Sequence, residues 1–327
     1  MEISDTWRPL ADVLLGRAEF TTPEVVRASG IELDYARRLW RALGFPPVGN
    51  DDRVFTRSDI EILRAVSGVV ESGSVDPGVL LQLTRVTGQS LARIADAQVT
   101  AAAERLDRQR SEQTSDEAVR AELVDRIKAL APYLEHFLTY IWRRHLLAAL
   151  LQVSATPSAA DRVLTIGFAD LVGFTAMSQE LEPRELAAMV DRFEAIAYEH
   201  IPARGGRVVK MIGDEVMFAA DDGVVAAEIA LALVDAHARD AALPDVRVGL
   251  ASGPVLAWEG DLLGPTVNLA SRLVNLARPK TALVADELGA QLQDNPQFAL
   301  RRLRRARLQG IGRVHLWVLR RARLPAE

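Results

Sequence analysis

Two aspartates stand where a carboxylate can hold a metal ion beside a phosphate. Asp170 follows a short apolar segment, 163–169, that is predicted as a strand, and Asp214 lies in a Gly-Asp turn between predicted strands over 207–211 and 216–220. A carboxylate at a strand end, near a glycine that admits a ligand to the backbone, suits a hard cation such as Mg²⁺ or Mn²⁺. Two such acids on neighbouring strands can hold two ions about 3.5–4 Å apart, an arrangement suited to phosphoryl chemistry. Taken singly, each aspartate also fits an ordinary turn or capping residue.

A second group of polar residues lies further along the chain. Asp261 is expected in a loop, and Asn268 and Arg272 are four residues apart on the helix predicted over 266–277, so both project from one face. An amide one turn before a guanidinium suits a ribose and a phosphate held side by side. The alternative is a solvated polar face. Lys210 is one of only three lysines among 39 basic residues, so its ammonium group is a candidate for a specific contact.

Together, the segments 168–174, 210–215 and 261–272 resemble the catalytic domain of class III nucleotide cyclases, in the order and approximate spacing that this family uses. The likeness covers about 163–318. Because three separate motifs agree, it is more specific than any one of them. It implies an adenylate cyclase, a phosphorus-oxygen lyase that converts ATP into 3′,5′-cyclic AMP and pyrophosphate.

The resemblance also implies a role for each of six residues. These roles are binding of two Mg²⁺ or Mn²⁺ ions by Asp170 and Asp214, recognition of adenine by Lys210 and Asp261, orientation of the ribose by Asn268, and stabilisation of charge on the α-phosphate by Arg272. An ammonium that donates to adenine N1 and a carboxylate that accepts from the N6 amine fit ATP, whereas guanine would present like groups at both positions.

In this family the active site lies between two catalytic domains packed head to tail, with the metal acids from one and the other four residues from its partner. One chain holds one copy of each residue, so the resemblance implies a homodimer with two equivalent sites. The chain departs from the family at 308–310, where Leu-Gln-Gly replaces a frequent Leu-Lys-Gly. Gln309 cannot supply the phosphate-binding charge of that lysine, so Arg307 or Arg313 is expected to replace it; a solvated, charged edge is the alternative.

Two domains are expected. Residues 1–153 are predicted to be all helical, 154–161 to form a linker, and 162–327 to form a ferredoxin-like α+β catalytic domain with the order β-α-α-β-β-α-β. The predicted N-terminal helices cover 22–30, 31–43, 60–70, 77–109 and 115–151, with a cap at Thr22 and breaks near Gly88 and Pro132.

The N-terminal half more loosely resembles the helical regulatory domain of some actinobacterial class III cyclases. Its opening, 22–60, also looks like a MerR-type helix-turn-helix, so a DNA-binding regulator is an alternative. Arginines such as Arg37 and Arg53 lie among acids such as Glu32 and Asp51, however, and no net positive field results, so binding to nucleic acid is not expected. A degenerate cyclase that only binds nucleotide is a further alternative.

Regulation is expected to pass through the last N-terminal helix, because it leads into the strand that bears Asp170. His136 and His145 are candidates for a proton-sensing role, with ordinary surface histidines as the alternative. A small apolar ligand between the aromatic helices around 133–142 is another candidate signal.

Composition excludes several classes of protein. The 327 residues include no cysteine, which rules out disulfide scaffolds, thiolate metal sites and cysteine nucleophiles, and the net charge is -5. The N-terminus lacks the pattern of a signal peptide, and the most apolar stretch, 134–153, is interrupted by Arg143, Arg144 and His145. A cytoplasmic protein outside the membrane is therefore expected.

Overall fold

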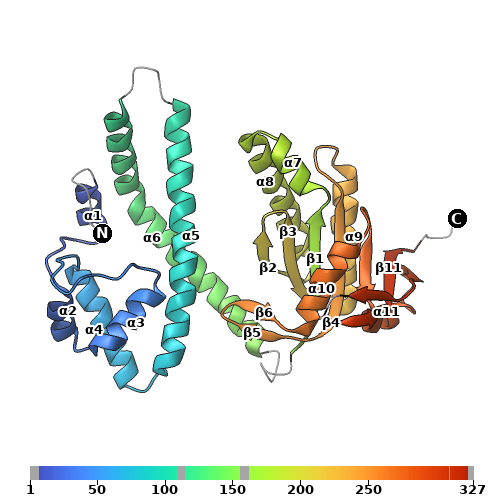
Figure 1. Cartoon of the computed structure of the whole chain (residues 1–327), viewed down its shortest axis with the longest axis horizontal. Coiled ribbons are helices and arrows are strands. Elements are labelled where there is room, and N and C mark those ends of the chain that lie inside the picture. The colour runs from blue at the N-terminus through green and yellow to red at the C-terminus, as the bar shows by residue number, and fades with distance from the viewer. Residues whose placement is uncertain (1–6, 110–114, 155–161, 309, 323–327) are drawn as a thin grey trace. The chain divides into compact units, whose positions relative to one another are not determined.

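A computed structural model describes residues 7–109, 115–154, 162–308 and 310–322 (Figure 1). The chain divides into two compact units, Met1–Gln152 and Val153–Glu327. Most of the expected linker, 155–161, lies outside the described residues. No helix in the described ranges combines the length and the apolar character needed to cross a bilayer.

The first unit is helical, as predicted. Its helices are α1 (Arg8–Leu14), α2 (Thr22–Ser29), α3 (Leu33–Ala42), α4 (Arg57–Glu71), α5 (Pro77–Gln109) and α6 (Asp116–Ser154). The predicted cap of α2 was one residue off. Thr21 is the N-cap and forms a capping box with Glu24, while Thr22 is already helical.

The two predicted helix breaks are wrong. α5 runs unbroken through Gly88, whose role is close packing: a Cβ there would lie 2.7 Å from the backbone of Leu43 at the end of α3. α6 likewise continues through Pro132, since a proline removes one backbone hydrogen bond of a helix that has many others.

The second unit is built on one sheet of seven strands in the order β2-β3-β1-β4-β7-β11-β8. These strands are β1 (Val163–Leu171), β2 (Arg207–Ile212), β3 (Glu215–Ala220), β4 (Val246–Pro254), β7 (Ala282–Ala285), β8 (Phe298–Arg302) and β11 (Leu316–Arg321). The helices are α7 (Phe174–Glu180), α8 (Pro183–His200), the short η1 (Pro202–Arg204), α9 (Gly223–Arg239), α10 (Pro265–Leu276) and α11 (Asp286–Leu292). The predicted β-α-α-β-β-α-β order is confirmed from β1 to β4.

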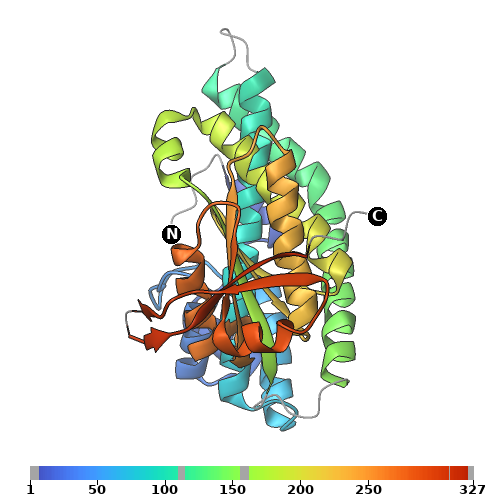
Figure 2. The ribbon, with the colours of Figure 1, turned by 90° about the vertical axis from the view of Figure 1, so that its right-hand side faces the viewer.

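Apolar side chains cover both faces of this sheet, whose strands are drawn as arrows in Figure 2. On one face, Leu171 and Phe218 pack with residues of α8, α9 and α11; on the other, Ile166 and Phe168 pack with residues of α10. Alternate residues of β1 therefore enter different cores, as expected for a strand buried on both sides.

Two short hairpins, neither of them predicted from the sequence, lie outside the main sheet. They pair β5 (Leu256–Trp258) with β6 (Asp261–Leu263) and β9 (Ala306–Leu308) with β10 (Gly312–Val314). Asp261 was expected in a loop and instead begins a strand.

Candidate active site

The two candidate metal acids lie next to each other at one end of the sheet. β1 pairs with β3 so that Asp170 stands opposite Glu215, and the turn that carries Asp214 joins β2 to β3. The backbone N–H of Leu171 donates to the carbonyl of Asp214 at 3.1 Å, which ties this turn to the end of β1. Gly213 makes the turn possible, with a φ of 62° that favours glycine.

Arg247 on β4 was not identified from the sequence and contacts the first of these acids directly. Its Nε donates to Oδ2 of Asp170 at 2.6 Å, and its Nη1 donates to the carbonyl of Asn275 on α10 at 3.2 Å. Arg247 can be identified only from its position opposite Asp170 in the pairing of β4 with β1. That pairing is known only once the order of the strands in the sheet is known.

Burial and mutual repulsion disfavour the charged forms of Asp170 and Glu215 in this acid cluster. Burial raises the pKa of Asp170, as does the neighbouring Asp214, while Arg247 opposes the rise. Burial, with Asp170 and Asp214 nearby, raises the pKa of Glu215 to about 7. Desolvated carboxylates that disfavour each other's charge are stabilised by a bound cation.

These residues fit a hard divalent cation. Both carboxylates supply oxygen ligands, which Mg²⁺ and Mn²⁺ prefer. The described residues contain no group of three or more acids, histidines or cysteines arranged to enclose a metal ion. A site with two carboxylates matches the way in which Mg²⁺ is bound beside nucleotides, where substrate phosphates and water complete the shell.

Lys210 and Asp261 form an ion pair. Nζ of Lys210 on β2 lies 2.5 Å from Oδ2 of Asp261 on β6, and Oδ1 accepts from the backbone N–H of Leu262 at 2.8 Å. The Lys210 side chain is 39% exposed and that of Asp261 33%, so both remain accessible to a ligand.

Asn268 and Arg272 project from α10, as predicted. Asn268 is exposed and Arg272 half-buried, and neither side chain hydrogen-bonds or ion-pairs with another described residue. α10 is fixed against β4 by close contact at Gly249 and by its buried residues Leu273 and Val274.

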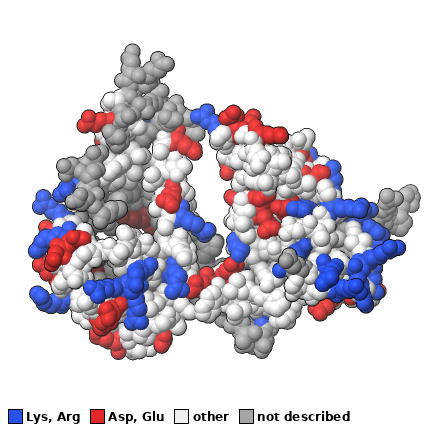
Figure 3. Space-filling view, in the orientation of Figure 1, with Lys and Arg blue, Asp and Glu red and all other residues white. Residues whose placement is uncertain are grey.

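Arg307 and Arg313 stand directly opposite each other on the β9–β10 hairpin, both exposed. Like charges at such a pair of positions repel, so the arrangement favours a bound anion. Gly310 at the tip lies near Arg272: a Cβ there would be 3.8 Å from Nη2 of Arg272. Gln309 lies outside the described residues. Figure 3 shows basic side chains gathered over the C-terminal strands.

The structure thus brings the predicted residues together in separate groups. Asp170 joins Asp214, Lys210 joins Asp261, and Arg272 lies beside the β9–β10 hairpin. No hydrogen bond or ion pair within the described ranges links Asn268 or Arg272 to either metal acid.

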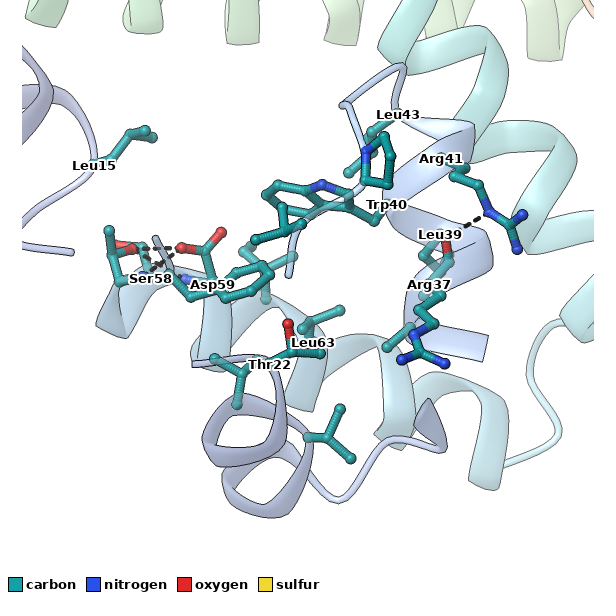
Figure 4. A pocket seen from close by; sticks show the side chains of 18 of the residues that line it. Leu15, Thr22, Arg37, Leu39, Trp40, Arg41, Leu43, Ser58, Asp59 and Leu63 are labelled. Carbon is teal, nitrogen blue, oxygen red and sulfur yellow. Dashed lines mark hydrogen bonds between the residues drawn. The ribbon is translucent and has the colours of Figure 1, made fainter. Parts of the chain in front are cut away.

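The first unit contains a cavity of about 540 Å³ between α2, α3 and α4 (Figure 4). Leu39, Trp40 and Leu63 line it with apolar surface, and Thr22 and Arg37 add polar groups. In the region around 133–142, where an apolar ligand was expected, Tyr133 and Phe137 are 75% and 57% exposed.

His136 and His145 both occupy exposed positions of α6. The two positions are nine residues apart in sequence, which corresponds to about 13.5 Å along a helix. They therefore do not form one cluster.

Two arginines of the helix-turn-helix segment form ion pairs within the unit. Arg37 lies 3.5 Å from Asp34, and Arg53 lies 3.2 Å from Glu24. These contacts neutralise charge that a phosphate backbone would need to meet.

Comparison with known proteins assigns both units. Residues 157–321 match the family described as the adenylate and guanylate cyclase catalytic domain, and residues 10–147 match the adenylate cyclase regulatory domain. Among solved structures, the adenylyl cyclase CyaB from P. aeruginosa is 22% identical, with a TM-score of 0.44 over 50% of this chain and 97% of that one.

Curated relatives extend over nearly the whole chain. An adenylate cyclase of Streptomyces coelicolor is 37% identical over 95% of this chain and 89% of its own length. One from Streptomyces griseus is 38% identical over 87% and 73%. A pH-sensitive adenylate cyclase of Mycobacterium tuberculosis is 30% identical over 91% and 77%. The chain therefore belongs to the class III adenylate cyclases, with a cyclase catalytic domain preceded by an adenylate cyclase regulatory domain.

Proposed function

We propose that two copies of this chain form two shared active sites, in which ATP is cyclised to 3′,5′-cyclic AMP with release of pyrophosphate. The observation that carries the proposal is the adjacency of Asp170 and Asp214 at the end of the sheet, beside a desolvated Glu215. A bound cation would stabilise this acid cluster. The separate Lys210–Asp261 pair can hydrogen-bond with a base that presents one acceptor and one donor on its edge.

In the reaction, the ribose 3′-oxygen bonds to the α-phosphorus, the bond from that phosphorus to the pyrophosphate oxygen breaks, and the 3′-hydroxyl proton leaves to water. Two Mg²⁺ or Mn²⁺ ions held by Asp170 and Asp214 would supply a lowered pKa for that hydroxyl and neutralisation of the triphosphate. No side chain of the protein is needed as a general base for this step.

The remaining side chains bind and orient the nucleotide. Lys210 donates to adenine N1 and Asp261 accepts from the N6 amine, which selects ATP over GTP. Asn268 orients the ribose. Arg272 donates to the α-phosphate oxygens, where negative charge increases as the new bond forms.

Arg307 and Arg313 are proposed to hold the terminal phosphates. Their position opposite each other on a hairpin whose tip approaches Arg272 supports this role. A lysine at position 309 would carry one positive charge, which Gln309 lacks. The two guanidiniums can supply positive charge in its place.

Two copies are proposed because the resemblance assigns the metal acids to one chain and Asn268 and Arg272 to its partner. The absence of a bond between these groups among the described residues supports a site completed by a partner. Head-to-tail pairing about a two-fold axis then creates two equivalent sites.

The first unit is proposed to regulate this activity. α6 ends at Ser154 and the strand that bears Asp170 begins at Val163, so a displacement of α6 is transmitted over few residues. A small ligand in the cavity lined by Trp40, or a proton at His136 and His145, is the proposed signal.

Production of cyclic nucleotide tests the catalytic proposal. Full-length protein is supplied with ATP or GTP and with Mn²⁺ or Mg²⁺, beside Asp214→Ala. Cyclic AMP from ATP that disappears in the variant supports the assigned chemistry; an unchanged rate in Asp214→Ala overturns the metal site. A chain lacking residues 1–152, checked for folding by circular dichroism, then gives the sign of regulation.

A further inference from the structure

The β5–β6 hairpin places an exposed tryptophan beside the residue proposed to recognise adenine. Trp258 pairs directly with Asp261 across a two-residue turn, in which Glu259 and Gly260 have φ values of 51° and 82°. Residues directly opposite in an antiparallel pair project from the same face, with Cβ atoms about 4.5–5.5 Å apart. Trp258 therefore leaves the hairpin on the side of the Asp261 carboxylate.

This face of the hairpin is apolar apart from Asp261. Leu256 and Leu263, which pair with each other, share the face, and they are 51% and 43% exposed. Trp258 is 47% exposed, and its indole makes no ring contact or hydrogen bond with any other described residue. The opposite face holds the buried Leu262. The exposed side chains of Leu256, Trp258 and Leu263 therefore share a face with the carboxylate of Asp261, which is paired with Lys210.

A purine base needs both kinds of surface. Lys210 and Asp261 can contact only its edge, which leaves the two ring faces in need of apolar cover. Aromatic side chains stack on bases of any identity, because every base presents a π face. An exposed indole directly beside an edge-reading pair has the placement that this contact requires.

We propose that Trp258 stacks on the purine ring of the nucleotide bound by Lys210 and Asp261 of the same chain. The proposal rests on the proposed function and adds a residue to its substrate site. Trp258 supplies affinity that is indifferent to the base, while the ion pair supplies the preference for adenine.

The test uses full-length Trp258→Ala and Trp258→Phe, with Tyr198→Ala as an exposed aromatic control on α8. The KM and kcat for ATP are measured with Mn²⁺. Inhibition constants are measured for 3′-deoxy-ATP, which has a base but cannot cyclise, and for inorganic tripolyphosphate, which has no base.

Trp258→Ala is expected to raise KM for ATP by about 5- to 150-fold, the range that corresponds to loss of one stacked base, with a smaller change in kcat. It should weaken 3′-deoxy-ATP by a similar factor and leave tripolyphosphate unchanged. Trp258→Phe should restore most of the affinity, and Tyr198→Ala should resemble the wild type.

Three outcomes would overturn the proposal. They are an unchanged KM in Trp258→Ala, an equal loss of affinity for tripolyphosphate, and loss of the dimer in size-exclusion chromatography with light scattering, which would assign the face to a second copy of the chain. Calorimetric titration with 3′-deoxy-ATP separates this test from that of the proposed function. Binding that weakens in Trp258→Ala supports stacking even if no cyclic AMP is formed.

Discussion

Arg247 and Asp170 form an ion pair in which Nη2 and Nε of the guanidinium both lie 2.6 Å from Oδ2 of the carboxylate. Asp170 is 12% exposed and Arg247 27%, so the pair is largely shielded from water. The same guanidinium donates to the carbonyl of Asn275 in α10. Arg247 therefore connects a proposed metal acid to the helix that carries Asn268 and Arg272.

Replacement of Arg247 by Met should destabilise the catalytic unit and weaken metal binding. The free energy of unfolding is expected to fall by about 1.5–3 kcal/mol, because a buried carboxylate loses its charged donor. The pKa of Asp170, already raised by burial, should rise further without the opposing charge. Activity at acidic pH should then require more Mn²⁺. Denaturant unfolding and Mn²⁺ titration at several pH values measure both effects, with the exposed Arg301→Met as the control; equal Mn²⁺ requirements would contradict this role.

Gly249→Ala should displace α10. A Cβ at this position would lie 2.6 Å from the carbonyl of Ala270 and closer still to the backbone nitrogen of Val274, and neither backbone atom can yield without movement of the helix. We expect loss of most activity together with a lower melting temperature. Gly68→Ala, on an exposed position of α4, has open space around its Cβ and no positive φ, and it serves as a control for the addition of a methyl group. A wild-type rate in Gly249→Ala would show that the position of α10 does not limit catalysis.

Lys210 and Asp261 should behave as a unit. Lys210→Met and Asp261→Asn are each expected to raise KM for ATP, because each removes one contact to adenine and also leaves its partner without a counter-charge. The double variant should lose less than the sum of the two single losses, since the second change removes a group that is already unpaired. Measuring KM and kcat for the wild type and the three variants completes this double-mutant cycle. Strict additivity would indicate that the ion pair does not persist in the enzyme.

The sequence indicated most residues of the proposed site because their motifs are local. Asp170 and Asp214 follow apolar strands, and Asn268 precedes Arg272 by one helical turn; these spacings survive in the structure. Arg247 was missed because its contact with Asp170 arises only when β4 pairs with β1, across 77 residues of chain.

The predicted helix breaks were wrong for a related reason. Gly88 lowers the intrinsic tendency to form a helix, yet close approach of α5 to Leu43 requires a residue without a side chain there. Tertiary packing thus decided what the local preference could not. The short strands β5 and β6 were also not predicted, because three residues are too few to show the alternation of apolar and polar side chains that indicates a strand.

His237 should make the catalytic unit less stable in acid. It is 2% exposed, its Nδ1 lies 2.8 Å from the carbonyl of Leu233, and its Nε2 has no partner among the described residues. Burial lowers its pKa from 6.5 in the folded state, so the unfolded state binds the proton first as pH falls. The contribution of the neutral ring is complete above about pH 6.5 and is lost at lower pH. Melting temperatures from pH 8 to 5 should fall less steeply in His237→Gln than in the wild type or the exposed His136→Gln.

Mixing two inactive variants should restore activity if the sites are shared. Asp170→Ala removes a metal acid and Arg272→Ala removes the proposed α-phosphate ligand, so each homodimer has two defective sites. A heterodimer of the two has one site with both defects and one intact site. With random pairing, half of the dimers are mixed and half of their sites work, so about one quarter of wild-type activity is expected after co-expression. The same two changes placed in one chain, mixed with wild type, provide the matched control. If the metal acids and Arg272 served the same site from one chain, every site in the mixed dimer would be defective and no cyclic AMP would appear.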